Sequence, residues 1–162
     1  MRLDGPAELL LVFEIDGRRH ALRLADVREV LPAATVTPLP AAPAIVEGVL
    51  ALRGEAVPVF AARERLGLPA RSLEPSDHYV VAWDGRRTVA LRVDRADGLR
   101  SVPADEIRAV GELTPASGPA VGAAALSDGL VLIHDLRRFL TAAEADSLDR
   151  ALRPPTAEAA PA

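Results

Sequence analysis

Short apolar runs separated by turn residues recur along most of the chain, which is typical of strands in small antiparallel sheets. The turns contain glycine, the residue that most readily adopts the left-handed backbone of a tight turn. Paired runs predict four β-hairpins, at residues 9–15 with 21–24, 45–52 with 56–60, 79–83 with 88–93, and 121–126 with 130–133. The run at 27–31 fits either a strand or a helical turn, and 99–102 predicts a further short strand.

Helical patterning is expected mainly near the end of the chain. Thr141 followed by Glu144 is a capping box, in which the threonine oxygen and the glutamate carboxylate accept hydrogen bonds from free backbone N–H groups. Leu148 and Leu152 are spaced i, i+4 and form one apolar stripe, so we expect a helix over residues 142–152. Single helical turns are expected at residues 61–66 and 103–107.

An internal repeat organises these elements into two halves. The sequence Asp-Gly-Arg-Arg at residues 16–19 recurs at 84–87, and the segment that begins at Gly48 is matched by one that begins at Gly122. Each half therefore has material for about five short strands, which is too little for a sandwich but suits a small closed barrel. Two such barrels packed together bury more apolar surface than either alone. Chance similarity in an alanine-rich sequence is the alternative interpretation.

The length of 162 residues predicts one domain or two very small ones. We expect a single domain over residues 1–155, with approximate barrel halves at 9–70 and 77–140 and the helix after them. Residues 156–162 are expected to form a flexible tail. The expected fold class is mainly β, with two small barrels of about five strands packed together, short helical turns and a C-terminal helix.

Composition and charge narrow the classes of function. Hydrophobic residues make up 49% of the chain, and the net charge of −4 argues against nucleic acid and anionic membranes as partners. Cysteine is absent, which excludes disulfides and thiol chemistry. No apolar run approaches the ~18 residues of a membrane span. The start of the chain lacks the apolar stretch of a secretory signal, so the cytoplasm is the expected compartment.

Patterns typical of catalysis are missing from the sequence. The spacing of His20, His78 and His134 is not that of a metal site, so we expect structural histidines, with convergence on a metal in space as the alternative. The chain has no lysine and hence no P-loop, and it has no serine elbow of the hydrolase type. Its carboxylates are dispersed, and nothing selects an acid–base pair. These absences favour a binding protein or adaptor without a cofactor.

Residues 48–60, which read GVLALRGEAVPVF, resemble the CheW-like family, the coupling proteins of bacterial chemotaxis, whose pattern is GVxNLRGxxVPVxDLR. The resemblance extends over about residues 9–152, nearly the whole chain. The sequence departs from the family at Ala51, where asparagine is usual, at Ala61, where aspartate is usual, and at His20, where an aromatic residue is common. These departures concern the choice of partner more than the fold.

The resemblance implies two intertwined five-stranded SH3-like barrels and a non-enzymatic scaffold that acts in signal transduction. Members of the family bind the cytoplasmic tip of a chemoreceptor and the regulatory domain of a CheA-type histidine kinase. The partners expected for this chain are therefore proteins, with no nucleic acid, no metal and no direct insertion into a membrane. The receptor helix is expected in the groove between the barrels.

Four positions match family positions associated with receptor contact, Val27, Glu29, Gly48 and Arg53, and Val57 is a fifth candidate for partner contact. On a strand, Val27 and Glu29 would share one face, and Arg53 at a hairpin tip would pair with a carboxylate of a partner. Other interpretations are core packing for Val27, a backbone conformation that only glycine allows for Gly48, and bracing of its own loop for Arg53.

The leading hypothesis is an adaptor that couples chemoreceptors to a chemotaxis histidine kinase through protein–protein contacts. The alternative is a small-molecule-binding or unrecognised enzymatic domain that uses the groove between the barrels. Histidines that converge there with carboxylates would favour that alternative. A weaker alternative is a regulatory domain detached from a kinase.

Overall fold

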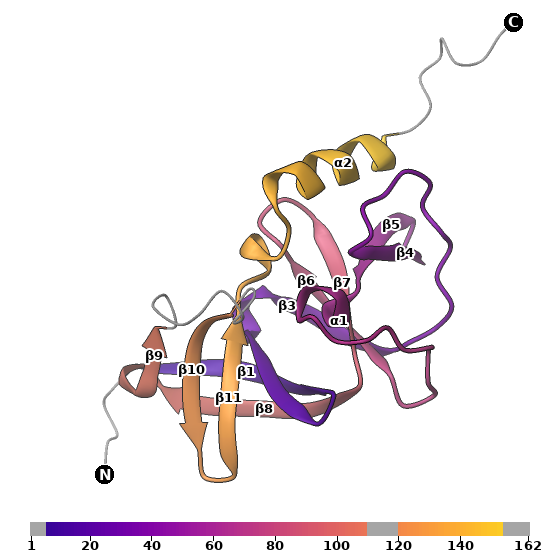
Figure 1. The fold of residues 1–162 in the computed structure, drawn as a ribbon. Coiled ribbons are helices and arrows are strands. Elements are labelled where there is room, and N and C mark those ends of the chain that lie inside the picture. The colour runs from indigo at the N-terminus through magenta and orange to yellow at the C-terminus, as the bar shows by residue number, and fades with distance from the viewer. Residues whose placement is uncertain (1–5, 110–119, 154–162) are drawn as a thin grey trace, which may run out of the picture.

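The structure is a computed structural model that describes residues 6–109 and 120–153. Its strands form two neighbouring sheets, in the orders β8-β1-β2-β11-β10-β9 and β3-β6-β7-β5-β4 (Figure 1). The first sheet, which we call barrel A, contains β1 (Ala7–Ile15), β2 (Arg18–Arg23), β8 (Arg95–Pro103), β9 (Ile107–Ala109), β10 (Ala120–Leu126) and β11 (Gly129–His134). The second, barrel B, contains β3 (Val27–Pro32), β4 (Val46–Leu52), β5 (Glu55–Phe60), β6 (His78–Trp83) and β7 (Thr88–Val93). The expected mainly β class with two small barrels is confirmed.

The two barrels do not follow the two halves of the sequence repeat. Barrel B takes its strands from one continuous stretch, residues 27–93, whereas barrel A combines the first hairpin with strands from residues 95–134. The reason is pairing between the halves, since β3 pairs antiparallel with β6 and β8 pairs antiparallel with β1. The expected halves, 9–70 and 77–140, are therefore corrected: each hairpin completes its sheet with strands from the other half.

The repeat is nevertheless visible in the topology. β5 pairs parallel with β7 in barrel B, and β11 pairs parallel with β2 in barrel A, at the same place in the two strand orders. A register shift also occurs at the same place in both barrels, immediately before Gly48 in β4 and before Gly122 in β10. One strand arrangement that is built twice thus accounts for the duplicated sequence.

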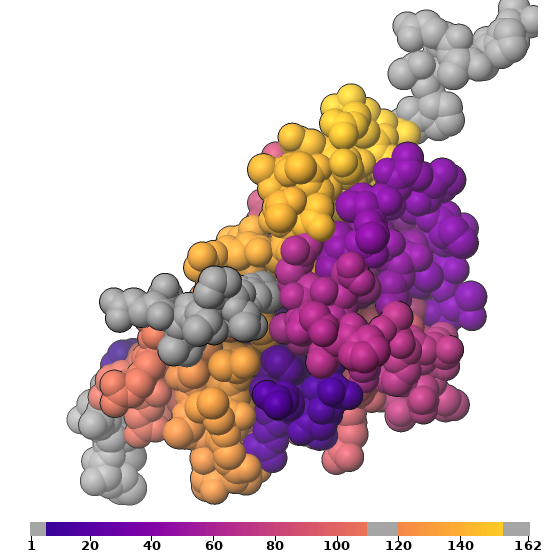
Figure 2. Space-filling model, in the orientation of Figure 1, coloured from indigo at the N-terminus to yellow at the C-terminus, as the bar shows by residue number. Residues whose placement is uncertain are grey.

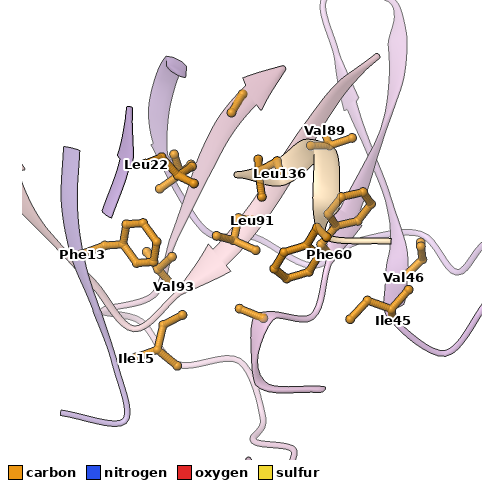
Figure 3. Packing of buried hydrophobic residues seen from close by; sticks show 14 of the residues in the cluster. Phe13, Ile15, Leu22, Ile45, Val46, Phe60, Val89, Leu91, Val93 and Leu136 are labelled. Atoms are coloured by element: carbon orange, nitrogen blue, oxygen red, sulfur yellow. The ribbon is translucent and has the colours of Figure 1, made fainter. Parts of the chain in front are cut away.

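Alternating side chains divide the core into three clusters, one inside each barrel and one between them. On β1, Leu10 and Val12 belong to the inside of barrel A, while Leu11, Phe13 and Ile15 face the other way and belong to the cluster between the barrels. Figure 3 shows part of that middle cluster, including Phe13, Ile15, Leu22, Ile45, Val46, Phe60, Val89, Leu91, Val93 and Leu136. Because both barrels contribute to it, neither can lose its partner without exposing a large apolar surface.

The helical elements are short except at the end of the described chain. They are η1 (Leu24–Asp26), α1 (Ala62–Arg65), η2 (Ala104–Glu106), η4 (Leu136–Arg138) and α2 (Ala142–Leu152). None of the helices in the described ranges is long and apolar enough to cross a membrane. The tail expected at residues 156–162 lies outside the described residues.

Helix α2 leaves barrel A and packs on barrel B (Figure 1). Its buried residue Leu148 joins the cluster between the barrels. Ion pairs hold the polar side of the helix to barrel B, from Arg65 to Glu144 and from Arg86 and Arg87 to Asp149. The helix therefore fastens the end of one barrel to the surface of the other.

The capping box predicted for α2 is present. Thr141 Oγ1 accepts a hydrogen bond from the backbone N–H of Glu144 at 3.1 Å, and Glu144 Oε1 accepts one from the N–H of Thr141 at 2.8 Å. We expect Thr141→Ala to lower the free energy of unfolding by about 1 kcal/mol, because one helix N–H loses its acceptor. Urea denaturation would measure this loss, and Thr141→Ser, which keeps the hydroxyl, should stay close to the parent. An equal loss in both variants would contradict the capping role.

Candidate functional site

Two of the five candidate residues meet at one end of barrel B. Arg53 lies in the turn between β4 and β5 with a φ of 50°, and both of its terminal nitrogens donate hydrogen bonds to the carboxylate of Glu29 on β3. The distance from Nη2 to Oε1 is 3.0 Å. The hydrogen bond from the guanidinium lowers the pKa of Glu29, and the same bond raises the pKa of Arg53. Both groups therefore stay charged throughout the neutral range.

The Glu29–Arg53 ion pair joins the two edge strands of barrel B, since β3 and β4 are at opposite ends of its strand order. The chain that follows β3 also reaches β4, where the backbones of Thr37 and Val49 exchange hydrogen bonds of 3.0 and 2.8 Å. Arg53 thus braces its own barrel, which was one interpretation of this residue. Its side chain is also 72% exposed, so the pair contributes little to stability and presents its charges at the surface.

Val27 and Glu29 do not share a face, contrary to the expectation from strand periodicity. The register between β3 and β6 shifts between them, so that Val27 lies opposite Ala82 and Glu29 lies opposite Val81. Arg28 is the extra residue of this β-bulge, and one extra residue moves the following side chains to the other face. Val27 consequently packs against the cluster between the barrels, which was its alternative interpretation.

Gly48 and Val57 are both buried. A Cβ atom at Gly48 would lie 2.5 Å from the carbonyl oxygen of Thr37, so this position requires glycine because of a close backbone approach. Val57 is 1% exposed and packs inside barrel B. Neither residue presents a side chain at the surface, whereas Arg53 does.

An uncovered apolar surface, not predicted from the sequence, runs along β1 and β8. Leu9 is 50% exposed and Leu99 is 57% exposed. Leu9 lies opposite Ser101 and Leu11 opposite Leu99, so the two exposed leucines are diagonal neighbours on the face of barrel A that packs against barrel B. We call this pair, Leu9 and Leu99, the β8 margin.

The β8 margin exists because the packing that buries Leu11, Phe13 and Ile15 on this face of barrel A does not extend to Leu9 and Leu99. Its signal in the sequence was the unbroken apolar run at residues 9–13. Such a run indicates a strand that is apolar on both faces and therefore needs cover on both. Neighbouring exposed leucines at the rim of a core are a candidate binding surface.

Two of the three histidines meet on the same face of barrel A. Nδ1 of His20 on β2 and Nε2 of His134 on β11 are 2.8 Å apart, and the ring of Phe13 stacks on His20. Burial lowers the pKa of His20 to about 4, with a contribution from Arg18. Burial also lowers the pKa of His134 to about 3, with a contribution from His20. Both rings are therefore neutral at pH 7, as hydrogen-bonded structural histidines are.

His78 is not part of this pair. Its Nδ1 lies 2.8 Å from the carbonyl oxygen of Ser76. Within residues 6–109 and 120–153, no three side chains of the metal-binding types come together. Neither His20 nor His134 is hydrogen-bonded to a carboxylate of the described residues. The combination that would favour an enzymatic groove, histidines with carboxylate partners, is not found at this pair.

Comparisons with known proteins agree with this architecture. The family model described as the CheW-like domain matches residues 9–144. The chemotaxis protein CheW of Rhizobium meliloti is 31% identical over 99 residues, which are 61% of this chain and 64% of that protein. CheW of Treponema pallidum is 32% identical over 71 residues, 44% of this chain and 42% of the relative. The aligned part is thus less than two thirds of either relative.

A solved structure has the same fold. The scaffolding protein TtCheW from Thermoanaerobacter tengcongensis superimposes with a TM-score of 0.74 at 22% identity, over 80% of this chain and 89% of that one. The family match extends from the first strand of barrel A into α2 and includes both barrels. This chain belongs to the CheW-like domain family.

Proposed function

We propose that this chain is a non-enzymatic coupling protein of the cytoplasm, which links chemoreceptors to a CheA-type histidine kinase in chemotaxis and needs no cofactor. A single domain over residues 1–155 would perform this role. The observation that supports the proposal best is the pairing of two distinct exposed features on one rigid two-barrel body: the apolar β8 margin and the charged Glu29–Arg53 end of barrel B. An adaptor needs two such surfaces, because it holds two partners at once.

The β8 margin suits the helical tip of a receptor. Leu9 and Leu99 lie beside the cluster between the barrels, against which Val27 of barrel B also packs. A helix laid along this rim would place aliphatic side chains at i, i+3 and i+4 spacing against leucine and valine. Binding there would be driven by burial of apolar surface on both sides.

The charged end of barrel B suits the regulatory domain of the kinase. In the CheW-like family that the sequence resembles, this domain has the same fold, and one barrel of the coupling protein pairs with one barrel of its partner. Arg53 is exposed but already paired with Glu29, so a partner would meet a fixed pair of opposite charges. Charges at the rim of an interface act mainly on selectivity and on the rate of association.

We expect Arg53→Glu to weaken binding of the kinase regulatory domain roughly tenfold. The substitution replaces an ion pair without net charge by two neighbouring carboxylates. The far-ultraviolet circular dichroism spectrum should not change, because the Arg53 side chain is exposed. Titration calorimetry with the isolated regulatory domain measures the effect. Arg108→Glu, which makes the same charge change at an exposed site on barrel A, is the matched control and should bind like the parent.

If a folded Arg53→Glu variant binds the regulatory domain with unchanged affinity, Arg53 is not part of the interface. The double variant Glu29→Arg with Arg53→Glu restores the ion pair with the two charges exchanged between the positions. If binding returns, the pair acts by bracing the turn; if it does not, the Arg53 side chain itself contacts the partner. The coupling function as a whole is overturned if neither a receptor tip nor the kinase regulatory domain binds the parent protein.

A further inference from the structure

The outer face of β10 and β11 has no polar side chain between its turn and His134. Ala125 pairs with Leu130 and Ala123 pairs with Leu132 on this face, while the residues between them, Ala124 and Val131, point into barrel A. Leu130 is 62% exposed, the largest value among the exposed large apolar side chains of the described residues. An antiparallel sheet that faces water normally alternates apolar with polar residues, so an all-apolar outer face indicates a surface that another element covers.

This face forms one wall of a groove beside barrel B. Two adjoining hollows of about 360 and 190 Å³ share Arg18 and Leu132. The larger one extends to the β10–β11 turn and Leu130, and the smaller one extends to Leu66 and Leu68, which follow α1 in barrel B. We call these two hollows together the β11 groove. In Figure 2 the orange surface of β10 and β11 lies next to the indigo β1–β2 hairpin, with the α1 segment above it.

The far wall of the groove is held in place by hydrogen bonds. The backbone N–H of Leu68 donates to the carbonyl oxygen of Arg63 at 2.8 Å. The Arg63 guanidinium in turn donates to Asp94 at the end of β7, at 2.7 Å. Leu66 itself packs against the cluster between the barrels. The groove is therefore formed before any partner arrives, which limits the entropy lost on binding.

The groove has one positive charge, that of Arg18, that is not balanced by an ion pair with the described residues. Arg19 at its rim is paired with Asp128, and Asp16 faces Arg63 at 3.7 Å. Arg18 is exposed and makes no ion pair or hydrogen bond with any residue of the described chain. A ligand of the groove would therefore gain from a carboxylate placed against Arg18 beside its apolar side chains.

The strand pairing decides what kind of segment can enter. β11 is paired with β10 from Gly129 to His134, but with β2 only from Leu132 to His134, so the edge that it leaves unpaired toward β2 is three residues long, 129–131. A strand added along this short edge would run directly into the pairing of β2 with β11, which begins at Leu132, so strand addition does not suit the groove. A helix satisfies its own backbone and needs only side-chain contacts, so a helix is the segment that fits.

We propose that the β11 groove is a third docking surface, which binds an amphipathic helix of a partner protein. The helix places aliphatic side chains between Leu130 and Leu132 on one wall and Leu66 and Leu68 on the other, and a flanking carboxylate pairs with Arg18. This surface is separate from the β8 margin, because β1 and β2 lie between β8 and β11 in the strand order. The proposal does not depend on the coupling function.

The test uses three synthetic helical peptides with a fluorescent label. One has leucine at positions i, i+3, i+4 and i+7 with glutamate on the flank, the second has lysine in place of the glutamate, and the third has serine in place of the leucines. We expect fluorescence anisotropy to show binding of the glutamate peptide, with clearly weaker binding of the other two. Leu130→Asp should weaken binding of the glutamate peptide roughly tenfold or more. Arg18→Glu should invert the preference between glutamate and lysine flanks.

The matched control is Leu73→Asp, which puts the same charge on an exposed leucine outside both the β8 margin and the β11 groove. It should leave binding of the glutamate peptide unchanged. The proposal is overturned if the parent binds no peptide, if glutamate and lysine peptides bind equally, or if Leu73→Asp rather than Leu130→Asp abolishes binding. Receptor and kinase binding by Leu130→Asp should equal that of the parent, which separates this result from the test of the coupling function.

Discussion

Replacing Gly48 with alanine is expected to lower the free energy of unfolding by about 3 kcal/mol. The added Cβ would lie 2.5 Å from the Thr37 carbonyl oxygen and 2.8 Å from Cγ2 of Val36. That oxygen accepts the 2.8 Å hydrogen bond from the N–H of Val49, which joins the two edges of barrel B. The clash therefore cannot be relieved by a side-chain rotation, and the backbone must move at the place where the barrel closes.

The sequence repeat supplies a control for this prediction. Gly122 occupies the equivalent position of barrel A, but its nearest atoms would be Cγ2 of Ile107 at 3.2 Å and the carbonyl oxygen of Arg108 at 3.4 Å. Gly122→Ala should therefore cost no more than about 1 kcal/mol, since a side chain can shift by a few tenths of an ångström. Urea denaturation followed by circular dichroism and by the fluorescence of Trp83 measures both variants. Equal losses would show that the close approach to Thr37 is not what makes Gly48 necessary.

Acidification from pH 6.5 to 4.5 is expected to destabilise the protein by roughly 2 kcal/mol for each histidine of the His20–His134 pair. The pKa values in the folded state, about 4 and about 3, are below the unfolded value of 6.5. Within this window the unfolded chain binds protons that the folded chain does not, so stability is full above pH 6.5 and falls as the pH falls.

Carboxylates with lowered pKa values, such as Asp94 and Glu144, act in the same direction but mainly below about pH 4.5, where they titrate when unfolded. Glu47, whose pKa is raised by burial, acts in the opposite direction. The window from pH 6.5 to 4.5 therefore reports chiefly on the histidines.

The double variant His20→Leu with His134→Val removes both partners of the buried hydrogen bond and is expected to be nearly neutral at pH 7. Its free energy of unfolding should stay level between pH 6.5 and 4.5. His20→Leu alone leaves Nε2 of His134 without its partner and should cost about 1–3 kcal/mol at pH 7. A parent protein whose stability is flat over this window, or a double variant that keeps the slope, would contradict the role of the pair.

Local signals in the sequence predicted most of the elements. The four hairpins and the capped helix follow from alternation, glycine turns and the Thr141–Glu144 box, all of which act within a few residues. β9 was not predicted, because three residues, Ile107–Ala109, are too few to show a period. The run at 27–31 was ambiguous because the bulge at Arg28 breaks the alternation that marks a strand.

Local sequence patterns did not predict how the strands are distributed between the barrels, nor did they predict the geometry of the site. The pattern at residues 27–31 does not say which strand β3 pairs with, and in the structure that strand is β6. Glu29 and Arg53 were both candidates, but their contact depends on closure of barrel B across its edge strands. The same applies to His20 and His134, which are brought together only by the parallel pairing of β2 with β11.

In the sequence, the strands of barrel B form one continuous stretch between β2 and β8 of barrel A, and this order has a consequence for synthesis on the ribosome. The β1–β2 hairpin emerges before the other strands, but its partners β8 and β11 follow only after the whole of barrel B has been translated. Barrel B can close once residue 93 is out, whereas the nascent hairpin has to wait, with its apolar faces unprotected, until residue 134 has left the exit tunnel.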